Sequence, residues 1–547
     1  MLLRFLSGCV VLLLSASLSA QFATFPSKTY FREQWARPPL DVEIELAGNL
    51  ENYVVDGKLQ LSLRAYLEIV MSNNPDVSLQ KLSVYEGQNA IQRALSPFDP
   101  NLTGTFDARR SATPSNDVLQ GADVRSALNQ TARFTYSESL ITGTDYQVGY
   151  VGSKLSNNSA FTTFNPSINQ SLEFRISQQL LRGRGKGIQR IPILIAESRL
   201  DQTEAQVRSQ IMNLIFQAEQ DYWSVVSARD QLRVQENSLE LAGRALERSR
   251  RELELGAISP LDIYQPEERY ARAQVLVTQA VYRLKQNEDA VRRQAAADLH
   301  PTVRQLPLVL TEAADPPIVT PVYDPEETVN RALRLRPEIE QRLRSIEIDD
   351  LDIRGTTDQL RPELTVSGAY SAVGRGGNFS DRSLTGGGSG TIVPGGVGDA
   401  LNQLFDFSFP TYTFGLTLQL PLANRRAAAD LADATIQKKR DLYQLRSLEQ
   451  QVRLEILQAI AEVESSDAAV KQATIAADFA QKRLDAEQQK YDLGVTTIFF
   501  VLDAQESLVV AEAAVVSQSI AYRRALLTLL RATGDLFEAR GVSVRYD

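Results

Sequence analysis

The sequence predicts a mainly α-helical protein built from two copies of a unit in which β-strands interrupt long helices. In the first copy Pro75 is followed 25 residues later by Pro100, and in the second Pro337 is followed 25 residues later by Pro362. Between and after these points, short stretches alternate apolar and polar residues as strands do, and longer stretches repeat apolar residues every seven positions as packed helices do. A repeat of this size determines the architecture before any single residue is interpreted.

The N-terminus is typical of an export signal. Arg4 supplies the positive charge, Val10 to Leu14 the apolar run, and SASLSA (15–20) the small residues before a cleavage site. We therefore assign residues 1–20 to a signal peptide. The single Cys, Cys9, precedes the apolar run instead of following it, which argues against lipidation of Cys9. Cleavage would leave a chain without Cys and therefore without disulfides.

The composition argues against several classes of function. Acidic residues outnumber basic ones, giving a formal net charge of −9, so nucleic acid is not an expected partner. One His, one Cys and three Met leave few residues for metal ligation or catalysis. His300 stands beside a proline in a linker, and no constellation of catalytic or metal-binding residues stands out. We predict no enzymatic activity, no cofactor and no metal site.

The repeat also predicts the boundaries. We expect an extended arm at 21–61, a first repeat at 62–300, a Pro-rich linker at 301–323, a second repeat at 324–534 and a short tail at 535–547. Ser62 and Asp324 open the two repeats and are both good N-cap residues. They lie 262 residues apart, which is also the offset between Pro75 and Pro337.

Strands are expected at about 101–181 in the first repeat and about 363–421 in the second. The clearest has an apolar face and a polar face, with Phe414, Leu416 and Leu418 alternating with Thr413, Gly415 and Thr417. A β-sandwich core would give the same pattern. However, so few strands could not close a sandwich around such long helices. A sheet with lipid on one side and water on the other fits the export signal better.

Two segments between the strands need separate interpretation. The first repeat is longer than the second, and residues 132–151 supply an additional hairpin around a turn at Thr142-Gly143. The Gly-rich segment 374–398 carries no Lys-Ser/Thr after its glycines, so it is not a phosphate-binding loop. We expect a flexible surface loop there.

Long helical hairpins are expected at about 188–299 and 425–533. Their heptad rows are Ile211, Ala218, Val225, Leu232, Leu239, Leu246 and Leu253 in the first copy, and Ile456, Val463, Val470, Ala477, Leu484 and Tyr491 in the second. Strict sevens indicate coiled-coil packing, either in a dimeric rod or as staves of a wider cylinder. A companion row of small residues in the second copy permits close approach of helices.

Six segments, in order and over two repeats, resemble TolC-like outer membrane efflux proteins. They are LSLRAYLEIVMSNNPD (61–76), QQLLRGRGKGIQRIPILIAESRL (178–200), QDYWSVVSARDQL (220–232), LGAISPLDIYQPE (255–267), LQLPLANRRAA (418–428) and LGVTTIFFVLDAQ (493–505). The resemblance covers residues 61–534. It implies a homotrimer in which each subunit gives four strands to a twelve-stranded β-barrel in the outer membrane. Four long helices per subunit would continue it as an α-helical barrel in the periplasm.

The resemblance further implies a passive exit duct of a tripartite efflux pump. Its partners would be outer membrane lipid, a periplasmic membrane-fusion adaptor protein and, through the adaptor, an inner-membrane transporter. Alternatives are the outer membrane channel of a type I secretion system and a soluble periplasmic coiled-coil scaffold. We expect the hairpin at 132–151 above the membrane or on the barrel rim, with additional barrel strands as the alternative.

The resemblance also implies functional residues at the hairpin tips. Leu255, Gly256 and Ala257 in the first copy, and Leu493, Gly494 and Val495 in the second, match tips that contact the adaptor. Asp262 and Tyr491 match positions that bond each other when the periplasmic mouth is closed, and Asp503 matches a ring of acidic residues around the axis. The chain departs from the pattern twice. Thr496 replaces a gate-locking Arg and Phe500 replaces a second ring Asp. For both Asp residues the alternative is a solvated carboxylate at a helix end.

Overall fold

The computed structural model describes residues 50–115, 122–159, 162–256, 258–298, 300–313, 322–381, 391–393 and 395–542. All of them belong to one unit, Asn49–Asp547. The signal peptide with Cys9, the arm up to residue 49, Ala257 and part of the Pro-rich linker lie outside the described residues.

Each copy begins with two short helices joined at a proline. They are α3 (Leu63–Asn73) and α4 (Pro75–Leu95) in the first copy, and α8 (Pro325–Leu335) and α9 (Pro337–Gln359) in the second. Ser62 accepts a hydrogen bond from the backbone N–H of Ala65, at 3.2 Å, and Asp324 accepts one from Glu327, at 3.4 Å. Both residues are therefore N-caps, as their sequence positions predict.

A small sheet joins the start of the first copy to the linker. It contains β1 (Val54–Val55), β2 (Lys58–Leu61) and β7 (Leu308–Leu310), in the order β1-β2-β7, with β2 and β7 parallel. In the described part of the chain, 3-10 turns lie at Leu50–Tyr53, Ser96–Phe98 and Val303–Gln305. Just after β7, Glu312 accepts a hydrogen bond from the backbone N–H of Leu63 at 2.8 Å, which holds the linker against α3.

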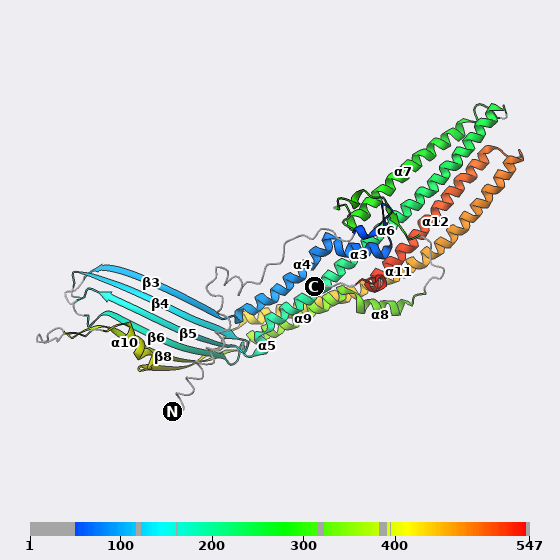
Figure 1. Ribbon diagram of the computed structural model, residues 1–547. Coiled ribbons are helices and arrows are strands. Elements are labelled where there is room, and N and C mark those ends of the chain that lie inside the picture. The colour runs from blue at the N-terminus through cyan, green and yellow to red at the C-terminus, as the bar shows by residue number, and fades with distance from the viewer. Residues whose placement is uncertain are drawn as a thin grey trace. The chain divides into compact units, whose positions relative to one another are not determined.

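The large sheet lies at one end of the unit (Figure 1). Its strand order is β10-β8-β6-β5-β4-β3, and short β9 (Thr391–Val393) pairs with the outer part of β8. The neighbouring long strands are antiparallel. Their bounds are β3 Asn101–Pro114, β4 Val124–Leu140, β5 Thr144–Asn157, β6 Phe164–Gln179, β8 Glu363–Asp381 and β10 Pro410–Gln419.

The hairpin expected at 132–151 is β4 and β5, and it lies within the sheet. Gly143 has φ of +79° in the turn between the two strands, a conformation that favours glycine. The described part of this subunit therefore supplies six long strands, where the resemblance implies four. The hairpin therefore adds two strands to the sheet, which was the alternative expectation. The first expectation, that it lies outside the sheet, is wrong.

The two faces of the large sheet differ in chemistry. Residues paired across neighbouring antiparallel strands lie on the same face. Phe414 pairs with Gly368, which pairs with Ile176, so the apolar residues of successive strands share one face. That face is open in the subunit, with Phe414 79% exposed and Phe106 68% exposed. The opposite face carries polar and charged residues, among them Arg133, Glu173, Arg175, Thr413 and Thr417.

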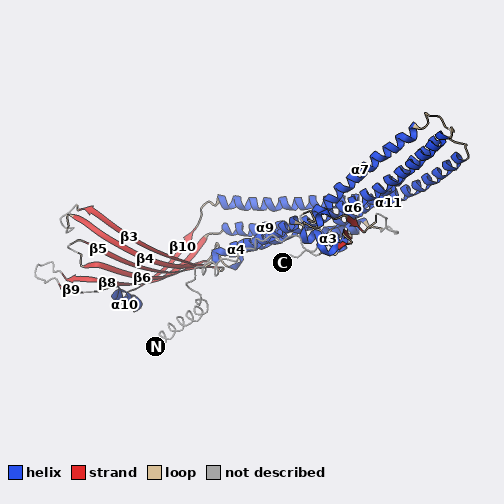
Figure 2. Cartoon of the chain, turned by 45° about the horizontal axis from the view of Figure 1, so that its top comes forward, coloured by secondary structure: helices blue, strands red, loops and turns tan. Residues whose placement is uncertain are grey.

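Part of the expected loop at 374–398 is ordered structure. β8 continues to Asp381, and α10 (Val397–Phe405) packs on β8 and β6 (Figure 2). Ala400 and Leu404 of α10 are fully buried. A Cβ at Gly374 would meet the carbonyl oxygen of Ala400, and one at Gly376 would meet that of Gly396. These two glycines predicted a loop, but they lie in a strand. Because they lack a side chain, α10 can approach the β8 backbone closely on the apolar face of the sheet.

Long helices follow the strands in each copy. The first hairpin has α6 (Ile191–Glu254), preceded by the single turn α5 (Lys186–Gln189), and α7 (Tyr264–Gln294). The second has α11 (Arg425–Asp492) and α12 (Ile498–Thr533), followed by short α13 (Leu536–Arg540). At 1.5 Å per residue, α6 and α11 each extend roughly 100 Å. α6 packs on α4, α7, α9 and α12, and α11 packs on α8, α9 and α12, so helices of both copies interleave.

The predicted heptad rows are the buried seams of these helices. Ile211, Ala218, Val225 and Leu246 are buried on α6, and Ile456, Val463, Val470 and Leu484 on α11. In the small-residue row, Val452, Ala459 and Ser466 are buried as well, and Ala473 and Ala480 are half-buried. The coiled-coil prediction is confirmed. Among the described residues, no helix combines the length and apolar character needed to cross a membrane.

Candidate functional site

The tips of the two helical hairpins lie at the end of the unit opposite the large sheet (Figure 1). Gly494 ends α11 with φ of +74°, and its N–H bonds the carbonyl of Tyr491 at 2.9 Å while the N–H of Val495 bonds that of Lys490 at 2.9 Å. This pair of bonds is a Schellman motif, which requires the left-handed conformation that glycine adopts without strain. Gly256 ends α6 with φ of +70°, and its N–H bonds the carbonyl of Leu253 at 3.0 Å.

The tips expose apolar side chains to solvent. Leu255 is 83% exposed, Leu493 79% and Val495 74%. No described atom lies within 4 Å of where a Cβ on Gly256 or Gly494 would be. These exposed apolar side chains lie together at the ends of the long helices, on residues that match the expected adaptor-contact positions.

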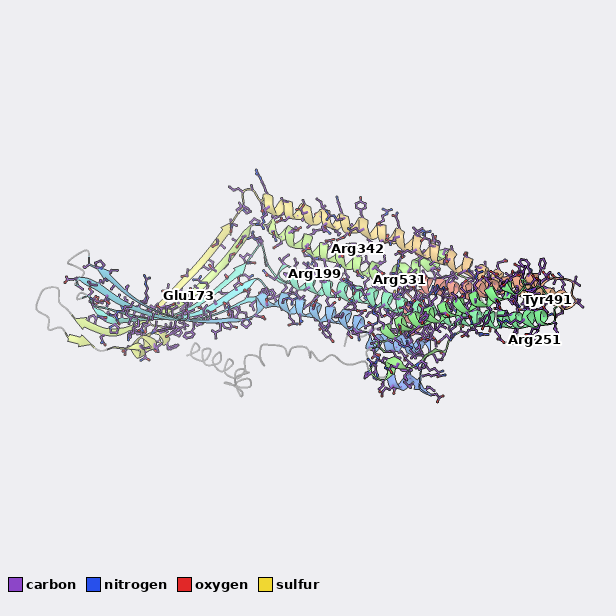
Figure 3. The ribbon with its side chains drawn as sticks, turned by 90° about the horizontal axis from the view of Figure 1, so that it is seen from above. Glu173, Arg199, Arg251, Arg342, Tyr491 and Arg531 are labelled. Atoms are coloured by element: carbon purple, nitrogen blue, oxygen red, sulfur yellow. The ribbon has the colours of Figure 1, made fainter. Side chains whose placement is uncertain are left out.

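The last turns of α6 and α11 are joined by a polar network. The Tyr491 hydroxyl donates a hydrogen bond to Glu252 Oε2 at 2.6 Å. Arg248 lies over the Tyr491 ring, 4.4 Å from its centre, and donates to Asp492 at 2.7 Å and to Glu252 at 3.0 Å. Burial, followed by the bond to Glu252, raises the pKa of Tyr491 to about 12, and the bond from Arg248 lowers the pKa of Asp492. Figure 3 shows Tyr491 near the tips, far from Glu173 on the sheet.

Asp262 does not bond Tyr491 in this subunit. Its carboxylate accepts a hydrogen bond from the backbone N–H of Ser259 at 3.2 Å, within the turn that leads into α7. Asp262 is exposed at this turn. Tyr491 bonds Glu252 instead of Asp262. Asp262 is a solvent-exposed carboxylate at a helix end, which is the alternative given for it above.

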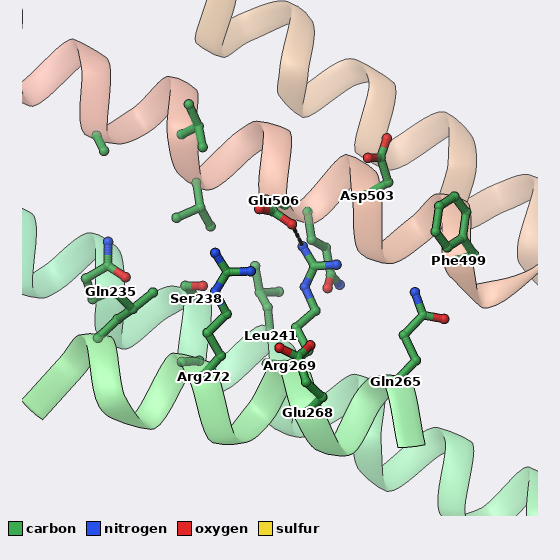
Figure 4. A pocket seen from close by; sticks show the side chains of 17 residues that line it. Gln235, Ser238, Leu241, Gln265, Glu268, Arg269, Arg272, Phe499, Asp503 and Glu506 are labelled. Carbon is green, nitrogen blue, oxygen red and sulfur yellow. Dashed lines mark hydrogen bonds and ion pairs between the residues drawn. The ribbon is translucent and has the colours of Figure 1, made fainter. Parts of the chain in front are cut away.

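A second set of charges lies farther from the tips along the helices, toward the sheet. It lines a groove of about 430 Å³ between α6, α7 and α12 (Figure 4). Arg269 of α7 donates to Glu506 of α12 at 2.8 Å and so connects the two hairpins across the groove. Asp503 also lines the groove, and it is half exposed. Its carboxylate accepts from Arg483 of α11 at 2.6 Å, so this candidate ring residue has a counterion in its own subunit.

The two positions that depart from the family pattern stand at the start of α12. Phe500 is 48% exposed, and its ring meets that of Phe499 edge-on with centres 5.4 Å apart. Thr496 is half buried in the turn between α11 and α12. The structure thus places an exposed apolar pair beside the Asp503 carboxylate. In the described part of the chain, no group of three or more His, Cys, Asp or Glu residues could hold a metal ion.

Comparison with known proteins places this architecture. Residues 328–535, most of the second repeat, match the family described as outer membrane efflux protein. The second repeat is an outer membrane efflux protein domain. The TolC-like resemblance and the outer membrane location that it implies are thereby confirmed. The family is one of transport proteins. Among curated proteins, none matches this chain.

Solved structures show that the similarity in fold extends over both repeats of the chain. CusC, studied for the changes that accompany folding and transmembrane channel formation, has a TM-score of 0.62 at 15% identity, covering 88% of this chain and 93% of CusC. The Campylobacter jejuni CmeC outer membrane channel has 0.59 at 14%, covering 91% and 94%. The open state of the Neisseria gonorrhoeae MtrE outer membrane channel has 0.58 at 16%, covering 87% and 89%. The predicted fold class, mainly helical with a membrane sheet, is confirmed.

Sequence reasoning did not identify the partners in these networks. Arg248, Glu252, Arg269, Arg483 and Glu506 lie on long polar helix faces that resemble any solvated coiled coil. The available signal was the spacing of Arg248 and Glu252, which are four residues apart and lie about two turns and one turn before Gly256. Their contacts with α11 depend on how the two hairpins pack.

Proposed function

We propose that the chain is the trimeric exit duct of a tripartite efflux pump, conducting solutes passively from the periplasm through the outer membrane. The observation that carries this proposal is the combination, in one outer membrane efflux protein, of a two-faced sheet and long helices. Three copies of the sheet would present apolar residues to lipid and polar residues to water. Closure into a ring would also pair the edges of β3 and β10, since lipid does not tolerate open strand edges.

The hairpin tips would serve two purposes. Leu255, Gly256, Leu493, Gly494 and Val495, together with Ala257, would contact the helical hairpins of a periplasmic adaptor. Three polar pairs near the tips would hold the two hairpins of one subunit together and keep the mouth narrow. They are Tyr491–Glu252, Arg248–Asp492 and Arg269–Glu506. Energy for transport would come from an inner-membrane partner. We assign the chain no catalytic role.

The test begins with the purified protein. We expect it in the outer membrane fraction, as a detergent-solubilised species with three times the subunit mass that migrates differently on gels before and after heating. Planar bilayers should show ion conductance. A monomer in detergent, or release from cells without detergent, would contradict the proposal and favour a soluble coiled-coil scaffold.

Adaptor docking is tested separately. A photo-crosslinking residue at Leu493 should capture the adaptor in cells, and the same residue at Tyr443 should not, because Tyr443 is equally exposed but lies on the shaft of α11. Capture from both positions, or from neither, would remove the tips from the interface.

A further inference from the structure

We propose that the β4–β5 hairpin widens the membrane ring of this duct, so that the trimer closes with eighteen strands and admits solutes too bulky for a twelve-stranded ring. This inference rests on the proposed trimer and extends it to the size of the cargo. It follows from the six long strands of the described residues, in the order β10-β8-β6-β5-β4-β3.

The hairpin has the surface of a membrane wall. Phe134 of β4 pairs with Tyr150 of β5, and Tyr150 pairs with Leu172 of β6, so the apolar face continues through the middle of the hairpin. Polar residues of the same face, Gln130, Glu138 and Lys154, lie nearer the strand ends. The Phe134 and Tyr150 rings stack with centres 6.4 Å apart. On the opposite face Arg133 lies in line with the polar residues of β6. A hairpin that lay outside the membrane or inside the channel would be surrounded by water and would not need an apolar face.

The hairpin is also long enough to cross the membrane. β4 has 17 residues and β5 has 14, against the roughly 9–11 that a tilted transmembrane strand needs. The β4–β5 ladder runs from Ala127–Asn157 to Leu140–Thr144, and the β5–β6 ladder from Leu155–Ser167 to Thr144–Gln178. Both strands are therefore hydrogen-bonded into the sheet along most of their length.

The strand directions permit closure. Successive long strands alternate in direction, so β3 and β10, at the two edges of the described sheet, run opposite ways. β3 of one subunit can therefore pair antiparallel with β10 of the next. An odd number of added strands would have made this pairing parallel, whereas a hairpin adds two and preserves it.

The size of the ring follows from strand geometry. With strands about 4.8 Å apart and tilted about 40°, a ring of eighteen strands has a backbone diameter of about 36 Å, against about 24 Å for twelve. A lining layer of side chains about 5 Å deep leaves a lumen of about 26 Å or about 14 Å. A single helix, about 10–12 Å wide, could pass either ring, but a solute about 20 Å wide could pass only the larger one.

The strand count is tested directly by electron cryomicroscopy of the detergent-solubilised trimer. We expect a threefold ring of eighteen strands in which β4 and β5 face lipid. A ring of twelve strands, with the hairpin folded above the membrane or inside the lumen, would overturn the inference and leave the exit-duct proposal intact.

The width is tested by polymer exclusion in planar bilayers. Polyethylene glycols of increasing size are added to the sheet side alone, and the largest that still lowers the conductance defines the width of that mouth. We compare the parent with a variant lacking residues 122–159, in which β3 would pair directly with β6. The deletion keeps the faces aligned, because Leu102 would then lie opposite Phe174, which is now in line with it across the two intervening strands.

We expect the cutoff diameter to fall to about half in the deletion variant. Polymers added to the helical-tip side provide the internal control, since both proteins should give the same cutoff there. An equal cutoff on the sheet side in both proteins would contradict the inference. If the variant does not assemble, the parent alone decides, because a cutoff near 14 Å would refute a wide ring. Absence of any conductance would instead count against the exit duct itself.

Discussion

The Tyr491 hydroxyl bonds the Glu252 carboxylate at 2.6 Å and so ties the last turn of α11 to the last turn of α6. The two residues are separated by 239 positions in the sequence. Arg248 completes the contact by stacking on the Tyr491 ring and pairing with Asp492. An outward movement of one hairpin tip relative to the other must break these bonds.

Tyr491→Phe should loosen the closed mouth. It removes the hydroxyl but keeps the ring beneath Arg248. A hydrogen bond to a charged group contributes about 1.5 kcal/mol or more, which is roughly a tenfold shift of a closed–open equilibrium for each subunit. We expect higher single-channel conductance or more frequent opening in planar bilayers. Tyr443→Phe, at an exposed position on the shaft of α11, is the control and should behave as the parent. Equal conductance for all three proteins would show that this bond does not restrain the mouth.

Asp503→Asn should reduce the preference for cations. The carboxylate lines the groove between the hairpins, and Arg483, its partner, would remain as an uncompensated positive charge. A charge about 8 Å from a permeating ion is worth about 0.5 kcal/mol in water, or roughly a twofold change in permeability ratio. Reversal potentials in a salt gradient measure this ratio, and Arg483→Gln should shift it in the opposite direction. The control is Asp478→Asn, which breaks the exposed ion pair between Asp478 and Lys482 on α11, the helix that also carries Arg483. Selectivity unchanged in both test variants would remove Asp503 from the ion path.

Gly494→Val should weaken adaptor docking without dissociating the trimer. The left-handed conformation costs a β-branched residue about 1–2 kcal/mol, so the turn would rearrange, although there is room for the side chain. Gly494→Asn is the matched control because Asn tolerates this conformation. We expect crosslinking from Leu493 to fall for Val and persist for Asn, with the trimer intact on unheated gels. Loss of the trimer in the Val variant would assign Gly494 to folding instead.

Asp349→Asn should make thermal stability less dependent on pH. Asp349 of α9 is buried against Asp441 of α11, and burial, then the hydrogen bond and charge of Asp441, raise its pKa to about 6. Because the folded pKa lies above the unfolded value, the stabilisation is complete at low pH and is lost as pH rises through 6. We expect the parent to lose more Tm than the variant between pH 5 and 7.5. Asp478→Asn, at an exposed ion pair with Lys482, should keep the parental slope. A parental slope in Asp349→Asn would mean that this carboxyl does not titrate in the range.

Local patterns predicted the long elements well. The heptad rows through Ile211 and Ile456 identified the buried seams, because a long coiled coil repeats the same packing every two turns. Ser62 and Asp324 marked the helix starts, because capping depends on residues a few positions apart. The alternation in β10 predicted a two-faced strand for the same reason.

Features that depend on distant contacts could not be predicted in this way. The glycines at 374 and 376 lower strand propensity, yet β8 passes through them because β6 supplies a hydrogen-bonded ladder and α10 covers their faces. Tyr491 was a candidate from its position, but its partner is set by the packing of α6 against the second copy. Asp262 met neither Tyr491 nor another hairpin, because its own turn supplies a donor from Ser259.

The seam between β6 and β8 has a consequence for how such a protein can be encoded. The two strands come from different copies, yet they are bonded from Ser167–Gly377 to Gln179–Thr365. If the gene were divided at the linker, one product would carry β6 and the other β8, each with an unpaired strand edge. The two edges would have to pair before the sheet entered the bilayer. Fusion of the duplicated halves delivers both margins on a single nascent polypeptide. Covalent continuity therefore replaces a recognition step that two separate proteins would have to complete in the periplasm.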